Sequence, residues 1–479
     1  MLTGQNGMLK RATEAKNTTE VASEKEGMQM AVTTSQMASD NYTSIKKDSL
    51  QSELNNYFGK EKTTLEDNKD GSYTVTMNNS KRKYTIEDDG SIIEGVYDKW
   101  NWTDSKEPTE KTSDEIHIYT VAELKWIADK VNNEGNTFEG YTIYLENNID
   151  FGAREISGNW VNTENEALKW TAIGKQKDIT LNATFEGNNH IIKGVYINDE
   201  TKFNGIFGNS SSILNLTVKN SYIKGGNCSG TVVGAVRSGT IENCHNINST
   251  VELYDESVGV GGVAGQVKGV IKNCTNIGGR VVVKKDADGY IRAGGVVGTL
   301  AVGESQAINC YNTGNVTGEG NFVGGVVGIA ANIVTKCYNT GTIVSKGIEG
   351  TGGIVGSCIT KIPQDISLCF NAGTVQAPES AGGISGYLGA QEYAAKETKC
   401  YNKGKVICTQ SNTGRGEIIG KMASDATVTN SYYFTNETLR YGVGAINAGG
   451  DLEAKRKGTQ KTTTNLNSYE EFLTWIEQQ

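Results

Sequence analysis

Residues Gly294–Gly328 read GGVVGTLAVGESQAINCYNTGNVTGEGNFVGGVVG, and variants of this stretch are repeated through the middle of the chain. Its first phrase is a pair of glycines, two small or apolar residues and another glycine. Complete copies begin at Gly261, Gly294, Gly324, Gly352 and Gly382, which are 33, 30, 28 and 30 residues apart, and degenerate copies begin at Gly230 and Gly416. A regular period of about 30 residues is typical of a repeat protein whose repeats pack on their neighbours.

A second phrase lies between the copies of the first and consists of a cysteine followed two residues later by an asparagine. Its six copies are Cys244 with Asn246, Cys274 with Asn276, Cys310 with Asn312, Cys337 with Asn339, Cys369 with Asn371 and Cys400 with Asn402. In five of the six a glycine follows the asparagine by two residues, namely Gly278, Gly314, Gly341, Gly373 and Gly404. Asparagine and glycine both tolerate positive φ, so the phrase predicts a tight turn in each repeat.

The repeats lack the pattern of a helical solenoid. No repeat has ten or more residues with a 3.6-residue apolar period, 59 of the 479 residues are glycine, and the apolar runs are short and β-branched. We therefore predict a mainly β fold, a right-handed parallel β-helix in which each coil has three short strands and three turns. Nine or ten coils between Ile143 and Val428 would make a rod roughly 45 Å long, at about 4.8 Å per coil.

Stacked coils bring equivalent residues of successive repeats side by side. The six asparagines are then expected to hydrogen-bond along the rod as an internal ladder. The six cysteines would form an apolar column in the interior, with Cys228, Cys358 and Cys408 as extras. We expect these thiols to stay reduced, because parallel in-register side chains keep Cβ atoms farther apart than the ~3.5–4.5 Å that a disulfide requires. One cysteine per coil, without any CxxC, favours core packing over zinc binding.

The repeats resemble a known family. NCYNTG at Asn309 and KCYNTG at Lys336, together with the Gly-Gly phrase, are similar to the GLUG-type repeats of large bacterial surface proteins and adhesins. WTAIG at Trp170, FEGNNHIIKGVYI at Phe185 and GIFG at Gly205 are similar to the opening coils usual in that family. The resemblance covers residues 116–479 and implies a parallel β-helix. It implies less about function, because such repeats occur in adhesins and in accessory regions of proteases alike.

The first 98 residues have a different pattern. The segment from Met1 to about Lys47 has good helix formers and a thin apolar stripe, which predicts one helix or two. Three alternating stretches separated by hairpin signals follow: SYTVTM at Ser72, KYTIED at Lys83 and SIIEGVYD at Ser91. We therefore predict a helix and a small antiparallel sheet in residues 1–98, and a polar linker in residues 99–115.

The segment Leu2–Thr19, LTGQNGMLKRATEAKNTT, resembles the part of type IV pilin-like proteins of Gram-positive bacteria that follows their hydrophobic N-terminal helix. In that family an apolar helix of about twenty residues comes first, anchoring the subunit in the membrane and later packing in the filament core. The apolar positions suited to continue such a helix are Leu2, Met8, Leu9, Ala12 and Ala15. The resemblance therefore implies an apolar helix upstream of Met1, and other pilin-like subunits as partners.

Two amphipathic helices are predicted at the ends of the β-helix, where open coils would expose strand edges. Residues 118–133 place their apolar side chains on one face, with Thr120 as N-cap and Glu123 as its capping-box partner. Residues 466–479 do the same behind Asn467 or Ser468. We expect each helix to cover one end of the rod, so that the chain alone is monomeric.

Charge and motif content argue against several function classes. The formal net charge is −9 with a pI of about 5.2, whereas nucleic-acid binding needs a basic face. The basic run Lys455–Lys457 is better explained as a solvated loop. His117, His190 and His245 are too scattered for a metal site, and EDNKDG at residues 66–71 lacks the twelfth-position glutamate of a calcium loop, which favours a simple turn. The sequence predicts no cofactor and no bound metal.

A polysaccharide lyase or hydrolase built on a β-helix is the main enzymatic alternative. Such enzymes need carboxylates with a basic or acidic partner on neighbouring coils. Carboxylates of the repeats lie in loops of different coils and are few: Asp255, Glu256, Asp286, Asp288 and Asp365, with Arg292 as the nearest arginine. Solvated loop charges explain them better than a catalytic cluster, so we expect no enzymatic activity.

Aromatic residues next to the cysteine column give the sharpest binding hypothesis. Strand alternation points them outward, and they are Tyr311, Tyr338, Phe370, Tyr401 and Tyr432. Such a column could bind sugar rings as a stacking platform. The alternative, which we favour, is that the rings stack on one another or lie under the N-terminal module.

These observations favour a non-enzymatic, pilin-like or pseudopilin-like subunit on the surface or pilus of a Gram-positive bacterium. Its expected role is structural or adhesive, with host or environmental glycans or proteins as the ligands to test. Two alternatives stay open: a polysaccharide-active β-helix enzyme and an accessory domain of a secreted protease.

Overall fold

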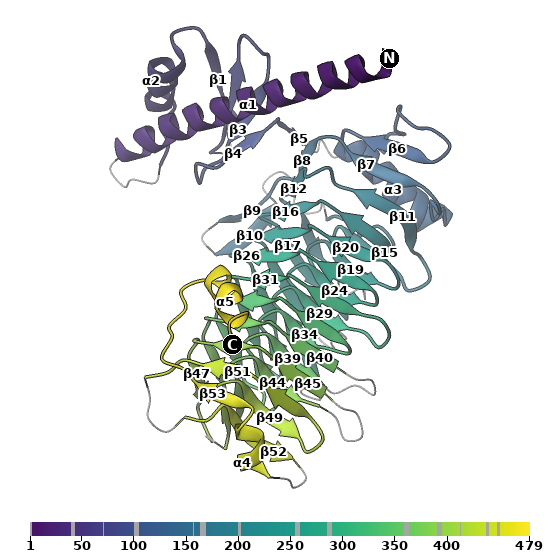
Figure 1. The fold of residues 1–479 in the computed structure, drawn as a ribbon. Coiled ribbons are helices and arrows are strands. Elements are labelled where there is room, and N and C mark those ends of the chain that lie inside the picture. The colour runs from purple at the N-terminus through teal and green to yellow at the C-terminus, as the bar shows by residue number, and fades with distance from the viewer. Residues whose placement is uncertain are drawn as a thin grey trace. The chain divides into compact units, whose positions relative to one another are not determined.

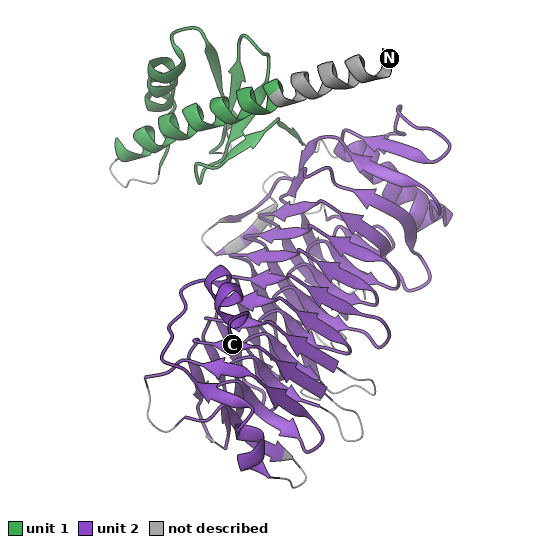
Figure 2. Ribbon diagram, viewed as in Figure 1, with its two compact units in different colours: residues 1–98 green, residues 99–479 purple. Residues whose placement is uncertain are grey.

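A computed structural model of the chain shows two compact units, Met1–Asp98 and Lys99–Gln479 (Figure 2). The structure describes residues 2–39, 44–69, 71–99, 105–156, 158–162, 169–199, 203–253, 259–284, 290–358, 364–389, 395–411, 413–436, 440–447 and 451–479. Side chains are described for the same residues except 2–15, 156, 159, 161, 162, 290 and 447. None of the helices in this part of the chain has the length and apolarity that crossing a bilayer requires.

The first unit packs two helices on a four-stranded antiparallel sheet of order β1-β2-β3-β4. Its elements are α1 (Leu2–Met37), α2 (Lys47–Phe58), β1 (Thr63–Asp67), β2 (Tyr73–Met77), β3 (Lys83–Ile86) and β4 (Ile92–Glu94). Val32 of α1, Leu54 of α2 and Val75 of β2 are fully buried in its core. The sequence did not predict β1, because Leu65 is its one apolar residue, and the third predicted stretch is split into β4 and β5 (Tyr97–Lys99). The apolar positions Leu2 to Ala15 lie in α1, outside the described side chains.

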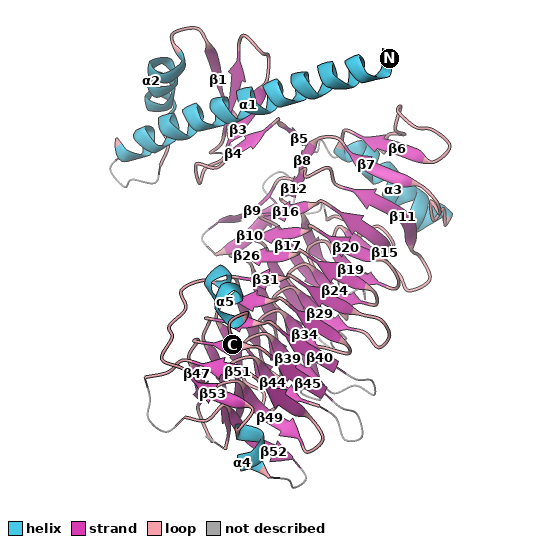
Figure 3. Cartoon of the chain, viewed as in Figure 1, coloured by secondary structure: helices cyan, strands magenta, loops and turns pink. Residues whose placement is uncertain are grey.

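The second unit is a parallel β-solenoid of about ten turns, which confirms the predicted mainly β class (Figures 1 and 3). A complete coil has five short strands, not the predicted three, because glycines and left-handed residues bend the chain at more corners than the apolar pattern reveals. One such coil is β31 (Tyr311–Asn312), β32 (Asn315–Gly318), β33 (Asn321–Gly324), β34 (Val327–Ile329) and β35 (Ile333–Thr335).

The first strands of successive coils form one long sheet, which we call the asparagine sheet. Beside β31, it contains β8 (Asn148–Asp150), β12 (Ile191–Lys193), β16 (Thr217–Lys219), β21 (His245–Ile247), β26 (Thr275–Ile277), β36 (Tyr338–Asn339), β41 (Phe370–Asn371), β46 (Tyr401–Asn402), β51 (Ser431–Tyr433) and β53 (Thr459–Lys461).

The second and third strands form two eight-stranded parallel sheets. Beside β32, the first has β13 (Tyr196–Asn198), β17 (Tyr222–Gly225), β22 (Thr250–Leu253), β27 (Arg280–Val283), β37 (Ile343–Ser345), β42 (Val375–Ala377) and β47 (Val406–Cys408). Beside β33, the second has β14 (Phe203–Asn204), β18 (Cys228–Ser229), β23 (Gly259–Gly261), β28 (Tyr290–Gly294), β38 (Thr351–Gly352), β43 (Ser380–Gly382) and β48 (Gly414–Gly416).

The fourth and fifth strands make two ladders that meet in the long strand β15 (Phe207–Leu214). Beside β34, the fourth strands are β19 (Val233–Val236), β24 (Ala264–Val267), β29 (Val297–Leu300), β39 (Val355–Cys358), β44 (Ser385–Leu388), β49 (Ile419–Ala423) and β52 (Val443–Asn447). Beside β35, the fifth are β20 (Thr240–Glu242), β25 (Val270–Lys272), β30 (Gln306–Ile308), β40 (Gln364–Ser367), β45 (Ala395–Thr398) and β50 (Thr427–Thr429). The opening strands are β6 (Glu115–Ile118), β7 (Thr142–Leu145) and β11 (Leu181–Glu186), and β9 (Ala153–Ile156) pairs with β10 (Asn159–Asn162) as a separate hairpin.

Inward-facing residues of the coils stack in register and fill the interior. One column runs Ile213, Ile241, Ile271, Ala307, Val334 and Ile366, all without exposed surface. Burial of such apolar columns is the main source of the solenoid's stability.

The opening end of the core is covered by α3 (Val121–Glu134), close to the predicted residues 118–133. Thr120 and Glu123 form the predicted capping box, with the Glu123 backbone N–H donating to the Thr120 Oγ1 atom at 3.2 Å. Leu124 and Ile127 of the helix join the core together with Ile143 of β7.

The predicted cap at residues 466–479 is wrong in its position. The segment forms α5 (Tyr469–Ile476), with Ser468 as N-cap, and α5 packs on the side of the solenoid against the outer face of the asparagine sheet (Figure 1). The aromatic side chains on that face bury the apolar stripe of α5, which the prediction had assigned to the last coil.

The far end is instead closed by β52, α4 (Leu452–Arg456) and β53 (Figure 1). The basic run Lys455–Lys457 is therefore not the solvated loop that we predicted. The Lys455 ammonium donates to the Ala426 carbonyl, and the Arg456 Nε donates to the Val443 carbonyl at 3.2 Å. These bonds give the carbonyls of the last described coils the donors that the N–H groups of a next coil supply elsewhere in the solenoid.

Candidate functional site: the asparagine ladder and the aromatic face

The six phrase asparagines lie in register on adjacent strands of the asparagine sheet, and each is fully buried. The side-chain Nδ2 of each donates to the Oδ1 of the next, over distances of 2.7, 2.7, 2.8, 2.9 and 2.8 Å from Asn246 to Asn402. Val218 precedes Asn246 in register and Tyr433 follows Asn402, so the ladder ends where the repeat phrase ends.

From Asn312 onward, each ladder asparagine also holds its own turn. The Asn312 Nδ2 donates to the Gly314 carbonyl at 2.8 Å, and its Oδ1 accepts the Gly314 N–H at 3.1 Å. Equivalent pairs join Asn339 to Gly341, Asn371 to Gly373 and Asn402 to Gly404. The central buried amides thus have all their donors and acceptors satisfied, which is what burial of a polar group requires.

The second glycine of the Gly-Gly phrase makes room for the next coil and for this ladder, because a Cβ there would also lie 2.0–2.2 Å from a carbonyl oxygen of the next coil. A Cβ on the second glycine of each phrase would lie 2.3–2.7 Å from the amide carbon of a ladder asparagine, at Gly262, Gly295, Gly325, Gly353 and Gly383. A Cβ on the first glycine would lie too close to a different atom, the carbonyl oxygen three residues later in the chain. At Gly324 this distance would be 1.9 Å. The two phrases of the sequence therefore specify one packed unit.

The left-handed residue of each repeat is not where the sequence reading put it. It is the residue before the cysteine, with φ between 52° and 55°: Asn243, Asn273, Asn309, Lys336, Leu368 and Lys399. The ladder asparagines do not have positive φ, and among the five glycines only Gly278 does, at 63°. In that repeat an extra residue puts Gly279 at the turn position, where a Cβ would lie 2.1 Å from the Asn276 Oδ1.

The six column cysteines are fully buried, and all nine cysteines are free thiols in the structure. Their Sγ atoms point at backbone carbonyls of the interior, as between Cys274 and Lys272 at 3.2 Å. Burial in the core raises the pKa of the Cys274, Cys369 and Cys400 thiols. The column therefore contributes packing and no accessible nucleophile.

The five predicted aromatic residues lie in register on the outside of the asparagine sheet. We call this surface the aromatic face. The Tyr311 and Tyr338 rings stack with centroids 4.6 Å apart, and those of Phe370 and Tyr401 with centroids 5.6 Å apart.

The helix α5 covers most of the aromatic face. Phe472 and Ile476 are buried against Phe370, Tyr401 and Tyr432. Tyr469 stacks on Tyr338 at 4.8 Å, and the edge of Trp475 meets the Tyr432 ring at 4.9 Å. The surface proposed for sugar rings is thus occupied by the C-terminal helix of the same chain.

Polar contacts fasten the chain that leads into α5. The Tyr401 hydroxyl donates to the Thr464 carbonyl at 2.6 Å, and the Lys403 ammonium donates to the Leu466 carbonyl at 2.7 Å. Burial raises the pKa of Tyr338 and of Tyr401 to about 12. The sequence did not reveal this docking, because the helix and the aromatic repeats are distant in the chain.

The other chemistry-bearing residues are held apart. The Nδ1 atom of each histidine contacts a different partner: Glu146 for His117, Asn148 for His190 and Thr275 for His245. No group of three or more metal-binding side chains occurs among the described residues. Asp255, Glu256, Asp286 and Asp288 lie outside them, and Asp365 lies in register with Lys396, away from Arg292 in sequence and sheet.

One carboxyl group inside the solenoid was missed by sequence reasoning. Glu397 takes the place of an apolar residue in its column, between Ile366 and Val428, and has no exposed surface. Its Oε2 accepts the Ser385 hydroxyl at 2.5 Å, and its Oε1 has no hydrogen-bond partner. Burial raises the pKa of Glu397 to about 8. The signal was present in the alternation of β45, where exposed Lys396 implies that Glu397 points inward.

The sheets and their register define the class of a repeat-containing parallel β-solenoid. No protein-family model matches the chain. Halomucin of Haloquadratum walsbyi is 29% identical over 199 residues, which is 40% of this chain and 2% of that protein. The chain thus spans a very small part of the relative it matches. A crystal structure of a Bacteroides ovatus protein named as a candidate immunoglobulin A1 protease aligns with a TM-score of 0.39 and 17% identity, over 77% of this chain and 90% of that one.

The ladder makes a graded prediction for alanine variants. Asn339→Ala removes bonds to Asn312, Asn371 and Gly341 in a buried site, and we expect it to lower the free energy of unfolding of the solenoid by about 3 kcal/mol or more. Asn246→Ala should cost less, because the Asn246 Oδ1 already has no partner. Exposed Thr340→Ala is the control. Urea denaturation followed by circular dichroism ranks the variants by stability. Equal denaturation midpoints for Asn339→Ala and Thr340→Ala would contradict the ladder's role.

Glu397 makes the solenoid less stable as pH rises. The pKa of this carboxyl is about 8 when folded and near the ordinary 4.5 when unfolded, so between these values the folded state binds more protons. The free energy of unfolding then falls by up to about 1.4 kcal/mol per pH unit and levels off above pH 8. Thermal unfolding from pH 5 to 9 should show this slope in the wild type, a flatter profile in Glu397→Gln, and the wild-type slope in the exposed control Glu349→Gln. A Glu397→Gln slope identical to the wild type would refute the assignment.

Docking of α5 depends on Phe472. Phe472→Ala removes a fully buried ring from the aromatic face and should cost about 3 kcal/mol of docking free energy. We expect limited proteolysis to release the segment after Lys461 at least tenfold faster in this variant, while the coils stay resistant. Thr474→Ala, on the exposed side of α5, should behave as the wild type. An equally protected tail in Phe472→Ala would mean that α5 is held by other contacts.

Proposed function

We propose that the chain is a non-enzymatic, surface-displayed β-solenoid with a structural or adhesive role. The observation that carries the proposal is the buried asparagine ladder, because it commits the repeated polar residue of the coils to holding the rod together. The repeated cysteine side chains of the described coils are buried in the core, and most of the repeated aromatic side chains are packed against α5. What remains for function is the outer surface of a rigid rod.

We further propose that the first unit is a pilin-like module, as the resemblance of Leu2–Thr19 implies. Its support is a long helix, α1, followed by a small antiparallel sheet, which is the element order of such modules. In this proposal an apolar helix upstream joins the subunit to other pilin-like subunits of a Gram-positive bacterium, and the solenoid is displayed outside the cell. The match of 199 residues to Halomucin supports a surface location.

Labelling of intact cells tests the display role. An antibody raised against residues 116–479 should bind intact cells of the source bacterium and lose its target when the cells are shaved with protease. Labelled filaments in electron micrographs would support the pilin-like part specifically. Label that appears only after lysis would overturn surface display.

Incubation with polysaccharides and proteins tests the non-enzymatic part. The purified chain should produce no new reducing ends or unsaturated uronates from pectins, alginates or host glycans, and no fragments from casein or immunoglobulin A. A reproducible product from any polysaccharide would favour the β-helix enzyme alternative. Proteolysis by the chain, or a protease domain encoded with it, would favour the protease-accessory alternative.

A further inference from the structure

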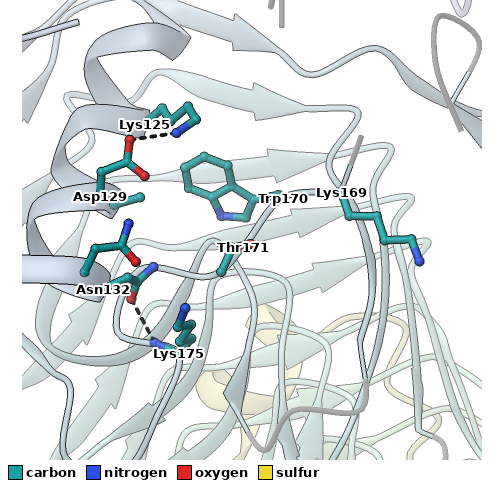
Figure 4. Close-up of a pocket in the computed structure, with 9 residues that line it drawn as sticks. Lys125, Asp129, Asn132, Lys169, Trp170, Thr171 and Lys175 are labelled. Atoms are coloured by element: carbon teal, nitrogen blue, oxygen red, sulfur yellow. Dashed lines mark hydrogen bonds and ion pairs between the residues drawn. The ribbon is translucent and has the colours of Figure 1, made fainter. Parts of the chain in front are cut away.

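A polar pocket of roughly 140 Å³ lies between α3 and the WTAIG segment at the opening end of the solenoid (Figure 4). It is lined by one stripe of the helix, namely Lys125, Ala128, Asp129, Asn132 and Asn133, and by Lys169, Trp170, Thr171 and Lys175 from the facing segment. It is separate from the aromatic face and from the asparagine ladder, which lie on later coils.

The walls of the pocket are pinned in place. The Asn132 side chain accepts the backbone N–H of Gly174 at 2.9 Å and donates to the Ala172 carbonyl at 3.0 Å. It also accepts the backbone N–H of Lys175 at 3.3 Å (Figure 4), so it holds the segment against the helix. Trp170 is 4% exposed, and its Nε1 donates to the Ile206 carbonyl at 3.0 Å. Gly174 has φ of 79°, and a Cβ there would lie 2.4 Å from the Asn209 carbonyl oxygen. A pocket with walls held this way is preformed, which lowers the cost of binding.

The charge of the lining is positive in a chain whose net charge is −9. Lys125 pairs with Asp129 at 2.7 Å, whereas neither Lys169 nor Lys175 forms an ion pair with a described residue. Because Lys125 is paired with Asp129 and the Lys169 side chain points away from the other lining residues (Figure 4), Lys175 supplies the excess positive charge, which attracts an anion.

The helix selects which anion fits. The lining stripe runs toward the C-terminal end of α3, where the helix dipole is negative, and Asp129 adds a carboxylate. Both disfavour a doubly charged phosphate, for which a helix N-terminus is the usual site. Asp129, Asn133 and Thr171 can instead exchange hydrogen bonds with hydroxyl groups, and Trp170 offers an apolar wall. The volume is below the ~300–1,000 Å³ of drug-sized sites, so it admits one small ring.

We propose that this pocket binds a singly charged, hydroxylated carboxylate the size of one sugar ring, such as the terminal uronic acid of an acidic glycan. Lys175 and Lys125 hold the carboxylate, and Asp129 and Asn133 hold the hydroxyls. The inference rests on the proposed surface role, because a surface location is where the chain would meet such glycans. Its chemistry is measured on the purified chain, so a failure here is distinguishable from a failure of surface display.

Calorimetric titration with glucuronate and with its methyl ester tests the proposal, because the two sugars differ in the charge of one group. We expect glucuronate to bind at least fivefold more tightly than the ester, and more weakly as salt is added. Lys175→Met should weaken glucuronate binding about tenfold, since it removes a charge-assisted hydrogen bond and keeps the apolar stem. Lys130→Met, on the same helix but outside the pocket lining, should leave binding unchanged.

Thermal unfolding of both variants checks that the fold is intact. A second titration compares a polymer whose uronates are all internal with one that carries terminal uronates, which distinguishes a chain-end site from an open groove. Preference for the internal uronates would overturn the pocket assignment. Equal binding of the ester, tighter binding of inorganic phosphate, no effect of Lys175→Met, or no binding of glucuronate would each overturn it as well.

Discussion

A buried amide in a stack of parallel coils needs a partner for each donor and acceptor, and here the amides of neighbouring coils and the turn of the same coil supply them. Each central asparagine gives one N–H to the next coil and uses the other atoms to close its own turn. The second glycine of the facing phrase leaves just enough space for the amide. The spacing of successive ladder asparagines varies between 27 and 36 residues because loops absorb the difference while the amides stay in register.

The chain covers the ends of the rod and one of its sides with different kinds of contact. At the opening end the chain covers the first coil with α3. At the far end it uses α4 and β53, and basic side chains of α4 donate to carbonyls of the last coils. On one side it covers a row of rings with α5, which is held by apolar packing and a few hydrogen bonds to main-chain carbonyls. An eight-residue helix has little stability of its own, so its order depends on docking.

The periodic features of the molecule were predictable from the sequence, and the long-range ones were not. Spacing of the phrases predicts coils, register, the Asn246–Asn402 ladder and the buried cysteines, because each follows from stacking equal units. The position of α5 depends on contacts such as Phe472 with Phe370, about a hundred residues apart, which amphipathicity alone cannot assign.

Left-handed Leu368 and Lys336 were missed because neither residue type signals that conformation, and tertiary packing imposes it. Glu397 was missed because carboxylates were expected outside, although strand alternation pointed it inward. The pocket beside Trp170 is likewise a product of tertiary packing between two segments.

Hydrogen–deuterium exchange of the full chain, read by mass spectrometry, tests most directly the claim that the ladder holds the rod together. The backbone N–H groups of Gly314, Gly341, Gly373 and Gly404 are bound by ladder oxygens, so peptides that contain them should exchange slowest in the solenoid. Protection should decline toward the opening coils before Asn246 and toward the last coil after Asn402. Exchange that is uniform along the solenoid, or fastest at the ladder glycines, would contradict the account.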